Sequence, residues 1–179
     1  APALLVDLRK VPALDRIAIS AQSVALGAMV RWCDIEESEP LKSAHPLLVA
    51  ATAHVAHYPI RNRGTVGGSL AHADFAAELP GVAVACDAEI VAVRSGGTRR
   101  IPAREFFEAP LTAALREDEV ITALVFPHWP RERRWGYREF ARQRAGFPLA
   151  GFAVYYDEVD GKASNAHLSV IGAHSRLER

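Results

Sequence analysis

A run of small and polar residues from 60 to 74 has the residue types in this chain that best suit anion binding. It reads Ile-Arg-Asn-Arg-Gly-Thr-Val-Gly-Gly-Ser-Leu-Ala-His-Ala-Asp. Glycines let backbone N–H groups come close to a ligand because no Cβ intervenes, and successive N–H groups in a turn form a concavity that suits a phosphate. The run lacks both G-x-G-x-x-G and the Lys-Ser/Thr of a P-loop. Taken alone, it predicts either a phosphate cradle of a less common kind or a tight turn between two elements.

Histidine and serine side chains offer weaker candidates. His54 and His57 lie three apart on a helix-like segment and could share a face, but no H-E-x-x-H pattern accompanies them, so we expect no metal site. His72 could transfer a proton, since imidazole titrates near neutrality, although a structural hydrogen bond is favoured. Ser69 lacks the G-x-S-x-G context of a hydrolase nucleophile.

The composition excludes several classes of protein. Half of the 179 residues are hydrophobic, and 21 basic residues balance 21 acidic ones. This balance gives no support for nucleic-acid binding. Cys33 and Cys86 have no C-x-x-C spacing, so an iron–sulfur or zinc site made by this chain is not expected. No apolar run reaches the ~20 residues that a membrane span needs, and free thiols favour a cytoplasmic location.

The elements that must position the glycine run alternate between helices and hairpins. We expect a helix from Asp74 to Ala85, with Asp74 as a candidate N-cap and Glu78 in its first turn. Asp160-Gly161 is a strong hairpin signal. This pattern predicts an α+β fold. The other expected helices cover 30–37 and 47–57, and the expected strands cover 3–8, 17–19, 24–27, 88–94, 119–127, 151–158 and 166–172.

A Pro-Arg-Glu-Arg-Arg segment at 130–134 is the expected domain boundary. It predicts one domain over residues 1–130 and the beginning of another over 135–179. Two hairpin strands alone are marginal in water, so the second domain is expected to be incomplete. The N-terminus has no initiating Met and looks cut, so we expect either that the chain is a fragment or that its missing parts are supplied elsewhere.

Three segments, taken together, resemble one known family. They are Leu5-Val6-Asp7-Leu8-Arg9, then Ala25-Leu26-Gly27-Ala28-Met29, then the stretch from Ile60-Arg61-Asn62 to Glu78-Leu79-Pro80. Their order is similar to that in the FAD-binding medium subunit of molybdenum hydroxylases, the group that contains xanthine dehydrogenase and carbon monoxide dehydrogenase. The resemblance runs from Leu4 to about Gly172.

The resemblance implies a two-part FAD-binding domain of the vanillyl-alcohol-oxidase-like type, followed by a small C-terminal α/β domain. Residues 1–130 would be the second part of the FAD domain, and the first part, with its own Gly-Gly-x-Ser-Leu loop, is missing. The aspartate that usually follows Ala145-Gly146 in this family is also missing here, and Phe75 stands where relatives have proline.

The resemblance also implies the residues that would contact the cofactor. The second pyrophosphate loop would be formed by four of them, and Glu78 would accept hydrogen bonds from sugar or ribityl hydroxyls. Asp74 would either do similar work or cap the helix. Val120, Ile121 and Phe147 would lie near the isoalloxazine ring. The four loop residues are Thr65, Gly67, Gly68 and Ser69.

The function implied by the resemblance is electron transfer with no catalytic residue in this chain. Electrons would pass from the [2Fe-2S] clusters of a small subunit through FAD to an external acceptor, and substrate would be oxidised at a molybdenum cofactor in a large subunit. A dimer of heterotrimers would be the expected assembly. The alternative is a non-catalytic interaction subunit that has lost FAD. A flavin oxidase is disfavoured because nothing here resembles a substrate domain.

Overall fold

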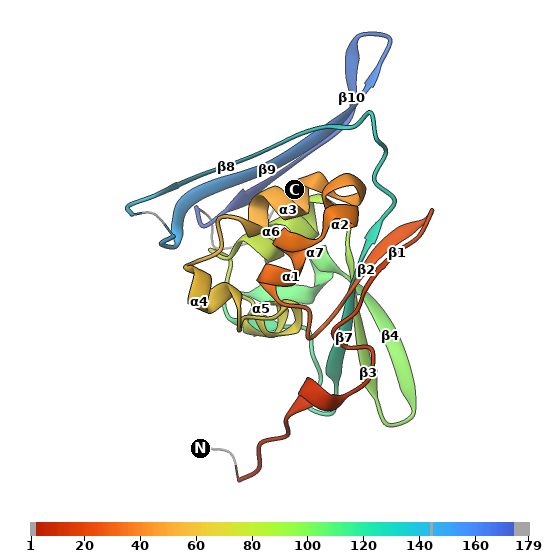
Figure 1. The fold of residues 1–179 in the computed structure, drawn as a ribbon, viewed down its shortest axis with the longest axis vertical. Helices are drawn as coiled ribbons and strands as arrows, with labels where there is room; N and C mark the ends of the chain where they lie inside the picture. The colour runs from red at the N-terminus through yellow and green to blue at the C-terminus, as the bar shows by residue number, and fades with distance from the viewer. Residues whose placement is uncertain (1–2, 144, 174–179) are drawn as a thin grey trace.

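Two antiparallel sheets enclose a layer of helices in the computed structural model, which describes residues 3–143 and 145–173. The five-stranded sheet has the order β1-β2-β7-β3-β4, and the three-stranded sheet has the order β10-β9-β8. The helices lie between them (Figure 1). A small β5-β6 pair completes the described strands. The fold is therefore mixed, with helices segregated from antiparallel sheets, as the α+β prediction requires.

The bounds of the strands follow the expected pattern closely in the middle of the chain. Alternating burial in β3 and β7 and tight turns such as Gly96, whose φ is +96°, produce the five-stranded sheet. The strands are β1 Ile17–Ile19, β2 Ser23–Gly27, β3 Glu89–Arg94, β4 Gly97–Pro102, β5 Phe107–Ala109, β6 Thr112–Ala113, β7 Val120–Pro127, β8 Arg134–Ala141, β9 Pro148–Val159 and β10 Lys162–Ile171.

The helices are short. A 3-10 turn, η1, covers Leu8–Lys10, and the α-helices are α1 Trp32–Glu37, α2 Glu39–Ala44, α3 Pro46–Thr52, α4 Tyr58–Arg61, α5 Val66–His72, α6 Glu78–Ala85 and α7 Ala103–Phe106. Every residue of α6 is buried, because the helix lies in the layer between the two sheets (Figure 1). Gly81 permits this: a Cβ there would lie 2.3 Å from Cγ1 of Ile171 in β10.

Three expectations about elements are wrong. The strand at 3–8 is replaced by an unpaired segment and η1, because Leu4, Leu5 and Val6 stand 72 to 85% exposed with no neighbouring strand. The helix at 47–57 ends at Thr52. β8 was not expected, and it turns the predicted closing hairpin into a three-stranded sheet.

The hydrophobic core lies where α6 meets both sheets. Val82 and Ala83 of α6 are fully buried, as are Leu124 and Phe126 of β7. Burying side chains of this size supplies most of the favourable free energy of folding. The core fixes α6 firmly, and its first residue, Glu78, is held at the edge of that core.

Candidate functional site

A cavity of about 680 Å³ opens beside α5 and the first turn of α6. Its volume is typical of small-molecule sites, which are mostly apolar with a few polar groups. Five segments converge on it: α1, the α3–α4 connection, α5 with the residues before it, the start of α6, and the segment after β8. The lining residues are Trp32, Val55, Ala56, Ile60, Arg63, Gly64, Thr65, Gly68, Ser69, His72, Ala77, Glu78, Gln143, Ala145, Gly146 and Phe147.

The glycine run forms a helix, α5, rather than a turn. Thr65 is its N-cap, and the Thr65 hydroxyl accepts a hydrogen bond from the N–H of Gly68 at 3.2 Å. The other early N–H groups also have acceptors inside the chain: Val66 donates to the carbonyl of Val30 at 2.9 Å, Gly67 to that of Ala28 at 2.7 Å, and Ser69 to that of Thr65 at 3.0 Å. The predicted row of free N–H groups is therefore not present.

The two glycines inside α5 have different tasks. A Cβ on Gly67 would lie 2.7 Å from the Cβ of Ala28, so this glycine is needed for close packing beside β2. Gly68 lines the cavity, and a Cβ there would meet only the Thr65 hydroxyl, at 3.0 Å. On this side, the polar groups that line the cavity are the hydroxyls of Thr65 and Ser69. The N–H of Gly68 is also there, but it donates to the Thr65 hydroxyl.

Glu78 is the carboxyl group of the cavity. The residue is only 7% exposed. Burial raises its pKa to about 7, and the negative charges of Glu139 and Asp74 act in the same direction. At neutral pH this side chain is poised between a hydrogen-bond acceptor and a donor.

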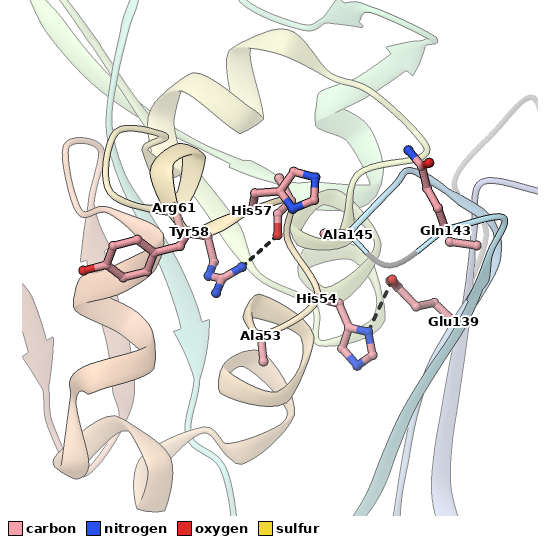
Figure 2. Close-up of a pocket in the computed structure, with 10 residues that line it drawn as sticks. Ala53, His54, His57, Tyr58, Arg61, Glu139, Gln143 and Ala145 are labelled. Carbon is pink, nitrogen blue, oxygen red and sulfur yellow. Dashed lines mark hydrogen bonds and ion pairs between the residues drawn. The ribbon is translucent and has the colours of Figure 1, made fainter.

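A second group of polar side chains comes from β8 and from the connection between α3 and α4, and one of its members, Glu139, acts on Glu78 through its charge. The hydroxyl of Tyr137 donates to Oε2 of Glu139 at 2.9 Å, and Oε1 of Glu139 lies 3.3 Å from Nδ1 of His54 (Figure 2). Burial raises the pKa of Tyr137, with the charges of Glu139 and Glu78 adding to the effect. Tyr137 therefore remains a neutral hydroxyl at physiological pH.

The structure brings five of the nine predicted cofactor contacts around one cavity. These are Thr65, Gly68, Ser69, Glu78 and Phe147. The Phe147 ring is 72% exposed, which leaves it free to cover a planar ligand. The four others do not line the cavity.

Each of the four has a different position for a physical reason. Gly67 packs against Ala28, as described. Asp74 does not cap α6: Ala77 stands at the N-cap, and Oδ1 of Asp74 accepts from the N–H of Ala76 at 2.9 Å. Ile121 is buried in the core of β7, and Val120 is 44% exposed at the start of that strand.

Some lining residues were missed by sequence reasoning. Trp32, Arg63 and Gln143 come from three separate segments, and only the fold places them together. A usable signal existed for Tyr137 and Glu139, because residues two apart on a strand face the same side. The strand itself, β8, was not expected.

Within residues 3–143 and 145–173, no group of three or more His, Cys, Asp or Glu side chains could hold a metal ion. Across the same part of the chain, the helices are all too short or too polar to cross a bilayer.

Comparison with known proteins gives consistent matches. The family model described as the FAD binding domain in molybdopterin dehydrogenase matches residues 1–129. The alpha subunit of the 6-hydroxypseudooxynicotine dehydrogenase complex of Paenarthrobacter nicotinovorans is 40% identical over 99% of this chain and 60% of its own length. The nicotine 6-hydroxylase medium subunit of the same organism is 38% identical over 99% of this chain and 62% of its own length.

A solved structure shows the same fold. Quinoline 2-oxidoreductase from Pseudomonas putida 86 superposes with a TM-score of 0.93 and 32% identity, covering 99% of this chain and 61% of the matched chain. The chain thus spans about three fifths of the length of these relatives. The match to the family model covers the glycine run, α5, Glu78 and the five-stranded sheet, and on that basis the chain belongs to the family of FAD-binding domains of molybdopterin dehydrogenases.

Proposed function

We propose that this chain is the FAD-binding portion of the medium subunit of a molybdenum-containing dehydrogenase or hydroxylase complex. The observation that carries the proposal is the gathering of Thr65, Gly68, Ser69, Glu78 and Phe147 around one cavity of about 680 Å³. When bound there, FAD supplies the chemistry that accepts and releases electrons. The side chains of this protein hold and orient it.

The donor and acceptor groups of the cavity fit the parts of FAD. The hydroxyls of Thr65 and Ser69 can donate to diphosphate oxygens. Ionised Glu78 can accept hydrogen bonds from sugar or ribityl hydroxyls, and its side chain is buried at the start of α6. The exposed ring of Phe147 offers a face for the isoalloxazine and excludes water from it.

The wider assembly is part of the same proposal. Residues 1–130 would be the second part of a two-part domain of the vanillyl-alcohol-oxidase-like type, and residues 135–179 the beginning of the C-terminal domain. The separate five- and three-stranded sheets support this division. Electrons would arrive from [2Fe-2S] clusters in a small subunit, beside a large molybdopterin subunit, in a cytoplasmic dimer of heterotrimers, and would leave to an external acceptor.

One observation favours the second candidate, an interaction subunit without FAD. The N–H groups at the start of α5 already have acceptors within the chain, so a diphosphate would gain fewer new hydrogen bonds than an open cradle provides.

The test is the flavin content of the full-length protein purified in its native complex. We expect absorbance near ~450 nm and about one FAD released per chain on denaturation. The Thr65→Val/Ser69→Ala double variant should lose most of this FAD, because it removes two donors. Colourless complex with no releasable FAD would establish the interaction subunit instead.

A further inference from the structure

The indole of Trp32 places a buried N–H group in the wall of the large cavity. Trp32 is the first residue of α1, is 5% exposed and lines the cavity of about 680 Å³. Its Nε1 has no acceptor within residues 3–143 and 145–173, and it is not one of the fully enclosed atoms that lack a partner there, which are Nε2 of His45 and Oγ of Ser169. Indole nitrogen can only donate, and buried indoles normally find a partner. The protein therefore leaves this donor to a ligand.

Gly64 lies directly against this N–H group. A Cβ on Gly64 would lie 2.6 Å from Nε1 of Trp32 and 3.0 Å from its Cδ1, so a side chain there would displace the indole. Gly64 lines the same cavity. Its φ is not positive, so the turn itself does not require a glycine. The close approach of the indole is the physical reason for a glycine at this position.

The backbone holds the indole in place without a ligand. Arg31 forms an antiparallel β-bridge with Thr65, and the N–H of Val66 donates to the carbonyl of Val30 at 2.9 Å. These contacts tie the start of α1, where Trp32 stands, to the start of α5. A donor that is already fixed in position loses little conformational entropy when a ligand binds to it.

The side chains on either side of Gly64 indicate that the ligand group is an anion. Arg63 and Thr65 both line the cavity, and Arg63 is exposed. The other titratable side chains of the lining are His72 and Glu78. Because Glu78 comes from α6 and its carboxylate would repel an anion, the part of the wall that suits an anion is segment 63–65 with the indole beside it. A guanidinium, a hydroxyl and an indole N–H together favour a group with several charged acceptor oxygens, such as a phosphate.

We propose that the indole N–H of Trp32 donates a hydrogen bond to a phosphate oxygen of FAD. The inference rests on the proposed function and adds to it a binding residue that lies outside the glycine run. Gly64 acts through Trp32 as a positioning residue, because the absence of a Cβ at this position lets the indole lie against the cavity wall.

The test is equilibrium dialysis of three probes against the flavin-depleted full-length complex. The probes are FAD, ADP, which has the diphosphate without the flavin ring, and riboflavin, which has the ring without a phosphate. Trp32→Phe keeps an aromatic ring and removes the N–H. It should weaken the binding of FAD and of ADP by the same factor, about tenfold or more, because a hydrogen bond to a charged group is lost. Riboflavin binding should not change.

Trp129→Phe is the matched control. Trp129 is also 5% exposed, but it does not line the cavity. The binding of all three probes should be the same in this variant as in the wild type, even if the variant is less stable.

A second variant tests the same donor without removing the indole. Gly64→Ala displaces the indole and should weaken the binding of FAD and ADP about as much as Trp32→Phe does. In the Trp32→Phe/Gly64→Ala double variant, the change at Gly64 should add little, because no N–H remains to be displaced.

The outcomes separate the two proposals. A native complex without FAD overturns the proposed function together with this inference. If the complex holds FAD, unchanged FAD binding in Trp32→Phe or in Gly64→Ala overturns the inference alone. Weaker riboflavin binding with unchanged ADP binding also overturns it, because the N–H would then contact the flavin ring and not a phosphate.

Discussion

The two walls of the cavity are built on opposite principles. In the α5 wall, the backbone N–H groups have acceptors within the chain: those of Val66, Gly67 and Ser69 donate to backbone carbonyls. Gly67 also packs on Ala28. The α6 wall holds Glu78, which forms no ion pair with the described residues, and the charge of a second carboxyl group, Glu139 on β8, helps to raise its pKa.

The difference shows how shape and chemistry are divided in this site. The α5 wall fixes the form of the cavity at no cost in unpaired groups. The carboxyl wall leaves a buried group free to change its protonation state, at a cost in stability that rises with pH.

The largest expected loss of stability comes from a substitution that disrupts the packing of the α5 wall. Gly67→Val places a Cβ 2.7 Å from the Cβ of Ala28 and 2.9 Å from its carbonyl oxygen. Neither atom can move without shifting β2. We expect a loss of about 3 kcal/mol or more in the free energy of unfolding, measured by urea denaturation. Wild-type stability in this variant would mean that the packing reason for Gly67 is wrong.

The next effect removes the charge from the carboxyl wall. Because the pKa of Glu78 is about 7 in the folded protein, above its ordinary value, the folded state binds more protons than the unfolded state between about pH 4.5 and about pH 7. Wild-type stability therefore falls as the pH rises through this window.

Glu78→Gln should not show this fall. It should gain on the order of 3 kcal/mol over wild type at pH 8 and nothing at pH 4, while retaining less flavin. Urea denaturation of both proteins at the two pH values is the measurement. Parallel stability curves would show that Glu78 is not held at a raised pKa.

The paired carboxylate of Glu119 should give a pH dependence of stability opposite to that of Glu78. The Arg99 guanidinium donates to both oxygens of Glu119, at 2.6 and 2.7 Å, and the N–H of Arg116 adds a third hydrogen bond. These bonds lower the pKa of Glu119 to about 2.

Its contribution to stability is present above the unfolded-state pKa and is lost as the pH falls toward 2. Glu119→Gln should accordingly be less stable than wild type at pH 7, by less than the change at Glu78, since the Arg99 side chain is 34% exposed and water partly screens its charge. The two proteins should converge in acid-induced unfolding monitored by circular dichroism.

The smallest change in stability is expected for Gly68→Ala, which tests whether the two glycines of α5 have different tasks. Gly68→Ala meets only the Thr65 hydroxyl, so the free energy of unfolding should change by no more than about 0.5 kcal/mol. Flavin binding should weaken about tenfold, because the hydroxyl and N–H at the cavity are displaced. Equilibrium dialysis of FAD separates this outcome from a general loss of folding, with Gly67→Val as the contrasting variant.

Much of the fold could be predicted from local pattern. Alternation in β3 and β7 and the Asp160-Gly161 turn, with φ of +51° and +70°, are encoded within a few residues. Helix α5 could not be predicted, because its glycines have poor helix propensity. The close packing of Gly67 against Ala28, a residue far earlier in the sequence, overrides that propensity.

The sequence by itself determined the family and the α+β class and indicated a set of candidate cofactor contacts, because glycines, hydroxyls and Glu78 lie close together along the chain. Only the tertiary structure decided which of them meet. In the structure, Gly67, Asp74, Val120 and Ile121 do not line the cavity, and the hydrogen-bonded pair of Tyr137 and Glu139 lies near enough for the charge of Glu139 to act on Glu78. The physical reason is that burial and charge depend on neighbours from distant elements, and here α6 lies in the helical layer between two sheets and draws Glu78 into the interior.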